Sequence, residues 1–227
     1  MMKAVMLALA GLCLTSLATP AQAGQVRVLC LGDSLTAGYG LPARAALPAV
    51  LQEMLTSEGL NARLINAGVS GDTTAGARAR LGRYLGDSPQ AAIVALGAND
   101  ALRGLDPALA EANLAAILQA LTSRGIRVLL AAWRATPDWG LPYAARFDEI
   151  YPRLATRFGV DLYPHFMAGV LDQPGLSHPV LGRSSLTLDG LHPTAQGVRV
   201  MARGIYPQVK GLVLAARAEP PAPPSER

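Results

Sequence analysis

The chain has 227 residues and a formal net charge of +4, with 51% hydrophobic, 16% charged and 5% aromatic residues. This apolar fraction can fill a large core, which excludes disorder for most of the chain and suits one domain. Two cysteines exclude a disulfide-rich scaffold and a cysteine-based zinc cluster. Because basic residues are scattered and aromatic residues are scarce, we expect no nucleic-acid partner.

The first 23 residues have the pattern of a secretory signal peptide. Lys3 precedes an apolar run over 4–17, and a small-residue cleavage site, Ala-Gln-Ala, follows at 21–23. A membrane anchor is the alternative, but the run is shorter than the roughly 18–20 residues that span a bilayer. We therefore predict a cleaved signal peptide over 1–23, a periplasmic or secreted mature protein, and no stable membrane insertion.

Five short apolar segments have the character of buried strands. They lie at 26–31, 62–66, 91–96, 127–133 and 160–163. Segments with helical spacing lie between them, and this alternation is typical of a parallel sheet that is covered on both faces. The sequence therefore predicts one α/β domain over residues 24–214.

Three helices can be placed by their start and stop signals. An aspartate followed by proline at 106–107 is a good helix start, and Gly125 supplies the stop. A second helix is expected over about 142–158, where Pro152 should kink or interrupt it. The last helix should begin near Thr194.

Two segments lack a regular pattern. Residues 173–188 are rich in proline and glycine and predict a long irregular loop, which is often functional and is here a candidate lid over a substrate pocket. Residues 215–227 are rich in proline and alanine and predict a disordered tail.

Four polar, glycine-bearing clusters follow expected strands or precede the last helix. Gly-Asp-Ser at 32–34 follows the first strand, and a loop with Gly71 follows the second. Asn99 follows the third strand, and Asp189 and His192 precede the last helix. Because ligands of doubly wound sheets bind at the carboxyl ends of the strands, we expect these clusters to meet at one edge of the sheet.

These residue types supply what acyl transfer requires. The Ser34 hydroxyl becomes a good nucleophile only when a base such as His192 takes its proton. A nearby carboxylate, Asp189, can orient the imidazole. Backbone N–H groups in a glycine loop and the Asn99 amide can stabilise the negative oxygen of the tetrahedral intermediate. Each residue alone is more commonly a turn or capping residue, but their joint occurrence in this order favours an active site.

Two rival motifs are incomplete. Thr36 stands where the Gly-x-Ser-x-Gly nucleophile elbow has its second glycine. Gly38 and Gly40 resemble part of a dinucleotide fingerprint, but no acidic residue ends a second strand. The sequence therefore implies no cofactor and no metal.

The clusters resemble, in order, the motifs of the SGNH, or GDSL-type, hydrolase family. The resemblance is strongest to secreted bacterial esterases related to thioesterase I, a group with lysophospholipase and arylesterase activities. It covers residues 26 to about 210 and is carried by four segments, 32–39, 66–74, 96–100 and 189–193. It implies a three-layer α/β/α sandwich with a five-stranded parallel sheet, as in flavodoxin-like folds.

The resemblance also implies roles for the clustered residues. By it, Ser34 is the nucleophile, His192 is the general base and acid, and Asp189 orients the imidazole. The oxyanion hole would consist of the N–H groups of Ser34 and Gly71 and the side chain of Asn99.

The resemblance further implies that the loop after the fourth strand shapes the acyl pocket. Relatives commonly have Pro-Asn-Tyr-Gly there, whereas this chain has Pro-Asp-Trp-Gly at 137–140. Trp139 and Leu141 are therefore candidate substrate-binding residues that alter the preferred acyl-chain length.

Three hypotheses follow. The first is an exported, monomeric serine esterase or thioesterase that acts on small-molecule or lipid acyl esters. The second is a carbohydrate O-deacetylase that acts on envelope polysaccharide with the same three residues. The third is a catalytically silent binding protein that keeps the fold, for which the loss of one of the three residues would be the expected sign.

Overall fold

The structure, a computed structural model, describes residues 24–171 and 185–218. The predicted signal peptide over 1–23, most of the predicted loop at 173–188 and the end of the predicted tail lie outside the described residues. Among the described residues, no helix is at once long and apolar enough to cross a membrane.

Five parallel strands form one sheet in the order β2-β1-β3-β4-β5. They are β1 (Val26–Gly32), β2 (Ala62–Gly68), β3 (Ala91–Ala95), β4 (Arg127–Ala131) and β5 (Asp161–Tyr163). All five predicted strands are confirmed. From β1 the chain first adds β2 on one side and then β3 on the other, so the strand order switches between β1 and β3. In such sheets the binding crevice is expected at the carboxyl ends of the two strands at this switch point.

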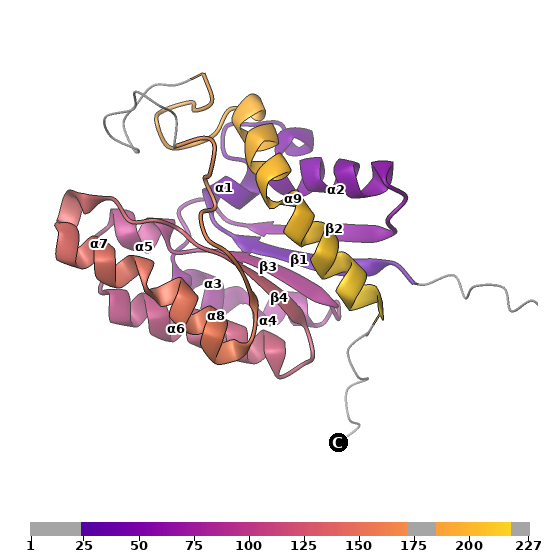
Figure 1. The fold of residues 1–227 in the computed structure, drawn as a ribbon, viewed down its shortest axis with the longest axis horizontal. Coiled ribbons are helices and arrows are strands. Elements are labelled where there is room, and N and C mark those ends of the chain that lie inside the picture. Colours follow the sequence, from indigo (N-terminus) through magenta and orange to yellow (C-terminus); the bar gives the residue numbers. More distant parts are fainter. Residues whose placement is uncertain (1–23, 172–184, 219–227) are drawn as a thin grey trace, which may run out of the picture.

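Helices cover both faces of this sheet (Figure 1). One face carries α2 (Leu47–Ser57) and α9 (Ala195–Ala218), and the other carries α3 (Thr74–Arg80), α6 (Pro107–Thr122) and α8 (Ile150–Phe158). The predicted three-layer α/β/α sandwich is therefore confirmed. The shorter α-helices are α1 (Ser34–Ala37), α4 (Gly82–Leu85), α5 (Ala98–Leu102) and α7 (Leu141–Asp148). Two 3-10 helices, η1 (Ala43–Ala45) and η2 (Pro137–Trp139), lie in the connecting segments.

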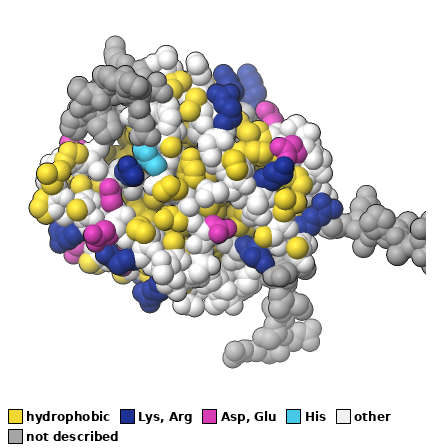
Figure 2. All heavy atoms as spheres, in the orientation of Figure 1, with side chains coloured by type: hydrophobic (Ala, Val, Ile, Leu, Met, Phe, Trp, Pro, Cys, Tyr) yellow, Lys and Arg dark blue, Asp and Glu magenta, His cyan; other side chains and the backbone are white. Residues whose placement is uncertain are grey.

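Burial along the strands follows their place in the sheet. Every residue of β3, at the centre, is buried. The edge strand β2 instead exposes Arg63 and Asn66, and a charged side chain on an edge strand discourages pairing with another chain. On the surface drawn in Figure 2, basic and acidic side chains are scattered among apolar ones and form no patch of a single sign.

The helix predicted over 142–158 is divided into α7 and α8, as expected from Pro152. Proline has no backbone N–H, and its ring clashes with the carbonyl four residues earlier, here that of Asp148. The division falls at Glu149, directly after that carbonyl. Gly159, with φ +60°, then ends α8.

The last helix is longer than predicted. α9 continues to Ala218, so the first four residues of the tail predicted over 215–227 are helical. Val213 and Ala216 continue the buried face of the helix, and each is 1% exposed. Alanine is a strong helix former, and the prolines of this segment come only after Ala218, so residues 215–218 continue the helix.

Candidate active site

The turn after β1 holds Ser34 in a buried position. Asp33 caps α1, where its carboxylate accepts the N–H of Leu35 at 3.0 Å. Ser34 is the first residue of α1 and only 8% exposed. A Cβ at Gly32 would lie 2.0 Å from Thr36 Oγ1, so this tight turn requires glycine there. We call residues 32–36 the nucleophile turn.

Asp189 and His192 lie in a loop that its own hydrogen bonds hold together. Asp189 Oδ1 accepts the N–H groups of Leu191 at 3.0 Å and of His192 at 2.8 Å. The N–H of Leu188 donates to the His192 carbonyl at 2.7 Å, which closes the loop at its base. We call residues 188–192 the histidine loop.

The structure brings Ser34, His192 and Asp189 into one hydrogen-bonded chain. His192 Nδ1 lies 2.7 Å from Asp189 Oδ2, and His192 Nε2 lies 3.0 Å from Ser34 Oγ. Partial burial raises the pKa of Asp189, but the hydrogen bonds from His192 and Leu191 outweigh this effect and lower its pKa to about 2. An ionised Asp189 accepts the Nδ1 proton, which leaves Nε2 free to accept the proton of the serine hydroxyl.

Three hydrogen-bond donors in the segments that follow β1, β2 and β3 have no partner among the described residues. They are the N–H groups of Ser34 and Gly71 and the side-chain amide of Asn99. Gly71 has φ +79°, a conformation that glycine adopts readily, and Asn99 lies in the first turn of α5. Because all three are donors, they cannot hydrogen-bond to one another, and the framework around them must set their positions.

The Asp33 carboxyl is almost completely buried beside the nucleophile. Burial raises its pKa to about 7, and the negative charges of Asp72 and Asp100 add to this rise. Its hydrogen bond from Leu35 acts in the opposite direction. Asp33 is therefore a capping residue whose charge changes near neutral pH.

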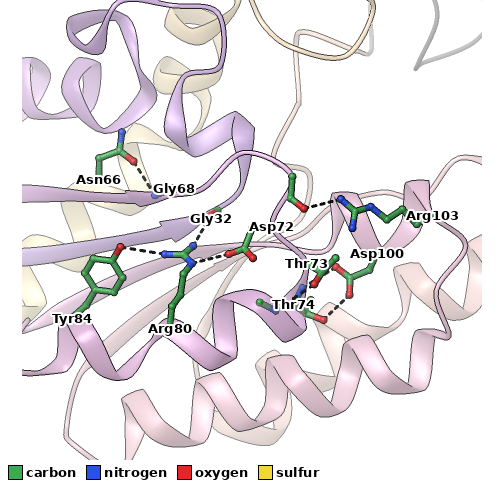
Figure 3. Close-up of polar contacts among 12 residues, drawn as sticks. Gly32, Asn66, Gly68, Asp72, Thr73, Thr74, Arg80, Tyr84, Asp100 and Arg103 are labelled. Atoms are coloured by element: carbon green, nitrogen blue, oxygen red, sulfur yellow. Dashed lines mark hydrogen bonds and ion pairs between the residues drawn. The ribbon is translucent and has the colours of Figure 1, made fainter.

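Asp100 fastens α5 to α3 beneath the site. Its Oδ2 accepts the backbone N–H of Thr74 at 2.9 Å, and its Oδ1 accepts the Thr74 hydroxyl at 2.6 Å (Figure 3). Asn113 also donates to the Thr74 hydroxyl, at 3.3 Å. Because Asp100 is 2% exposed and adjoins Asn99, these bonds limit movement of the helix that carries Asn99.

The two candidate substrate-binding residues are exposed, Trp139 at 56% and Leu141 at 75%. The Trp139 ring packs on Gly104, where a Cβ would lie 2.6 Å from Trp139 Cε2. Gly104 follows Arg103, whose side chain contacts Gly71, so Trp139 is connected to the site through this short chain of contacts. Leu141 is the more exposed of the two.

Sequence reasoning assigned no role to several residues around the site. The ring of Tyr39 lies with its centroid 4.5 Å from that of His192. Arg103 donates to the Gly71 carbonyl, and its position four residues after Asn99 on a helix could have revealed it. Arg80 contacts both Gly32 and Asp72, and no regular spacing indicates these contacts.

No three His, Cys, Asp or Glu side chains within residues 24–171 and 185–218 lie close enough together to hold a metal ion. The arrangement instead offers a serine hydroxyl, a base oriented by a carboxylate, and unpaired N–H donors. These are groups that acyl transfer uses.

Comparison with known proteins identifies the family. The sequence pattern of the GDSL-like lipase/acylhydrolase family matches residues 30–200. The chain belongs to this family. This GDSL-like hydrolase is 34% identical to "Esterase TesA" of Pseudomonas aeruginosa over 202 aligned residues. The aligned region covers 88% of this chain and 96% of that protein. The family resemblance noted in the sequence is confirmed.

Two further relatives of this GDSL-like hydrolase agree with that assignment. A "Thioesterase 1/protease 1/lysophospholipase" of Escherichia coli is 36% identical over 187 residues, which is 82% of this chain and 84% of that protein. The crystal structure of AlinE4, an SGNH-hydrolase family esterase, superimposes with a TM-score of 0.65 at 44% identity over 83% of this chain and 96% of that chain. The GDSL-like hydrolase is therefore an ester-bond hydrolase, and the hypothesis of a catalytically silent binding protein is set aside.

Proposed function

We propose that this GDSL-like hydrolase is an exported serine esterase or thioesterase that cleaves acyl esters of small molecules or lipids through an acyl-enzyme. The observation that carries the proposal is the hydrogen-bonded chain from Asp189 through His192 to Ser34. The names of the relatives, which include esterase, thioesterase and lysophospholipase, support this substrate class.

In the first half of the reaction, Ser34 Oγ attacks the acyl carbonyl carbon while its proton passes to His192 Nε2. Asp189 stabilises the imidazolium that forms. The carbonyl oxygen becomes negative and is stabilised by the N–H groups of Ser34 and Gly71 and the side chain of Asn99. The tetrahedral intermediate then collapses, its bond to the leaving oxygen or sulfur breaks, and His192 donates its proton to that atom.

In the second half, water replaces the leaving group. His192 takes a proton from the water as the water oxygen attacks the acyl carbon. The resulting intermediate collapses, the bond to Ser34 Oγ breaks, and the proton returns to the serine. The products are a carboxylic acid and the free enzyme, and the cycle uses only groups on this chain and water.

The experiment measures hydrolysis of nitrophenyl esters and matching thioesters of graded chain length. Ser34→Ala should lower kcat at least about 10³-fold, since removal of the nucleophile leaves only binding and oxyanion stabilisation. Ser57→Ala, a surface serine whose hydroxyl bonds only the Met54 carbonyl, is the matched control and should retain full activity. Equal rates for wild type and Ser34→Ala would refute the proposal.

Acetylated glycans, assayed beside this ester series, test the alternative substrate class. Release of acetate from acetylated glycans, with no hydrolysis of longer acyl chains, would establish the carbohydrate deacetylase instead.

The proposed export rests on the signal-peptide pattern of residues 1–23. Mass spectrometry of the exported protein should find a mature chain that begins at Gly24.

A further inference from the structure

The three proposed oxyanion donors lie on three different segments of the chain. Ser34 is in the nucleophile turn after β1, Gly71 is in the loop after β2, and Asn99 is in α5 after β3. An oxyanion hole requires its donors within about 2.7–3.1 Å of one point, so these segments must be held in register. Two arginines that the proposed chemistry does not use connect them.

Arg80, at the end of α3, connects the first two segments (Figure 3). Its Nη2 donates to the Gly32 carbonyl at 3.0 Å, and its Nε donates to Asp72 Oδ2 at 2.7 Å. Gly32 lies two residues before Ser34, and Asp72 directly follows Gly71. One guanidinium group therefore contacts the nucleophile turn and the Gly71 loop at the same time.

The surroundings of this ion pair fit it closely. The side chains of Arg80 and Asp72 are only 12% and 10% exposed, so solvent screens the pair weakly. Tyr84 accepts a third hydrogen bond from the guanidinium at 3.3 Å. At Gly76 a Cβ would lie 2.0 Å from Asp72 Oδ1, which means that the start of α3 accommodates this carboxylate only because residue 76 is glycine.

Arg103 connects the second and third segments (Figure 3). Its Nη2 donates to the Gly71 carbonyl at 2.8 Å, and its backbone N–H donates to the Asn99 carbonyl at 3.3 Å. The side chain thus runs from the helix that carries Asn99 to the backbone of Gly71. Unlike Arg80, Arg103 is exposed, and it can be replaced without opening the core.

From these contacts we infer that Arg80 and Arg103 are positioning residues that hold the N–H groups of Ser34 and Gly71 and the amide of Asn99 in one oxyanion hole. The inference rests on the proposed function, since it assigns these two side chains to the same site. The bonded carbonyl and the N–H of Gly71 lie in the two peptide units that meet at its Cα, so the bond from Arg103 restrains the position of the residue that carries the N–H.

A positioning role predicts a particular kinetic signature. Negative charge on the carbonyl oxygen develops in the transition state and is small in the bound ester. Loss of either arginine should therefore lower kcat and leave KM nearly unchanged. A purely structural role would lower the melting temperature or the amount of active enzyme without this separation of kcat from KM.

The experiment compares Arg80→Met, Arg103→Met and Arg153→Met on one nitrophenyl ester, with active enzyme counted by fluorophosphonate titration. We expect kcat per active site to fall roughly 10- to 100-fold for the first two variants, a partial loss of oxyanion stabilisation, with KM within about twofold of wild type. Arg153 forms surface ion pairs with Glu111 and Glu149, so its variant is the matched control and should retain full activity.

Arg80→Lys tests whether charge alone is sufficient. Lysine keeps the positive charge but lacks the planar fork that contacts two acceptors, so we expect kcat to remain roughly 10-fold below wild type. If Arg80→Lys has the wild-type kcat, simultaneous contact of Arg80 with the nucleophile turn and the Gly71 loop is not required, and this role of Arg80 is refuted.

The outcomes separate this inference from the proposed function. If Ser34→Ala is inactive while Arg103→Met retains wild-type kcat, the positioning role fails and the serine mechanism stands. If Ser34→Ala is fully active, the proposed function fails. Should Arg80→Met not fold, the exposed Arg103 still decides the question, because its replacement leaves the core intact.

Discussion

The nucleophile turn and the histidine loop meet at one site but are held in different ways. Ser34 is 8% exposed, and the turn that carries it is bound by Arg80 from α3, far along the chain. The Asp189 side chain is 49% exposed, and its loop is bound mainly by hydrogen bonds among its own residues. One half of the site thus depends on the packed domain, whereas the other depends on local backbone geometry.

This difference predicts which substitutions affect stability and which affect only the reaction. A change in the nucleophile turn or its neighbours should alter the free energy of unfolding, because the turn is packed on all sides. A change of the exposed Asp189 side chain in the histidine loop should alter the rate and leave the free energy of unfolding nearly unchanged.

The largest expected effect is that of Asp189→Asn on catalysis. An asparagine amide would donate to His192 Nδ1, so Nε2 would carry the proton and could not accept one from Ser34. We expect kcat to fall about 10³- to 10⁴-fold, with the free energy of unfolding changed by less than about 1 kcal/mol. Ester hydrolysis and urea unfolding measure the two quantities. Asp161→Asn, an exposed carboxylate on β5, is the control, and an equal loss of activity there would contradict the assignment.

The next effect tests the packed half of the site. At Gly68, at the end of β2, a Cβ would lie 2.3 Å from the backbone nitrogen of Ala37 in α1. Because backbone cannot move aside as a flexible side chain can, Gly68→Ala should lower the free energy of unfolding by about 3 kcal/mol. Urea unfolding measures this change. Gly82→Ala, where nothing lies within 4 Å, should instead be neutral or stabilise the protein by up to about 1 kcal/mol.

The smallest effect is a dependence of stability on pH. Because burial raises the pKa of Asp33 to about 7, the folded protein holds a proton that the unfolded chain, with its ordinary carboxyl pKa, has lost. The folded state therefore loses stability as pH rises toward 7, by roughly 2 kcal/mol between about pH 5.5 and 7.5.

Urea unfolding at the two pH values measures this loss in wild type and in Asp33→Asn. Asparagine has no titrating proton, and its side-chain oxygen can still accept the Leu35 N–H, so the variant should show a smaller difference. An unchanged difference would mean that another group is responsible.

The fold was predictable from the sequence where burial is complete. The strands were recognised because a strand buried on both faces, such as β3, is an unbroken apolar run. Helix α2 was not predicted, although Leu47, Leu51 and Leu55 are buried at helical spacing. Pro48 near its start resembles a break in the pattern and is in fact tolerated, since the first turn of a helix needs no N–H donor there.

The site was predictable only in part. Ser34, Asp189 and His192 could be recognised because each lies at the boundary of an expected element. The contacts of Arg80 could not be, because they join residues 8 and 48 positions apart and depend on the direction in which α3 leaves the Gly71 loop. Residues that hold a site together carry no local pattern when their partners come from separate strands.

The hydrogen bond between His192 and Ser34 joins positions 158 residues apart. Ser34 follows the first strand, whereas His192 directly precedes α9, which packs across β1, β3 and β4. On the proposed mechanism, a chain that has been made only in part carries its nucleophile without its base. Hydrolysis on this mechanism therefore requires the C-terminal part of the domain, because the base lies three residues before the start of α9.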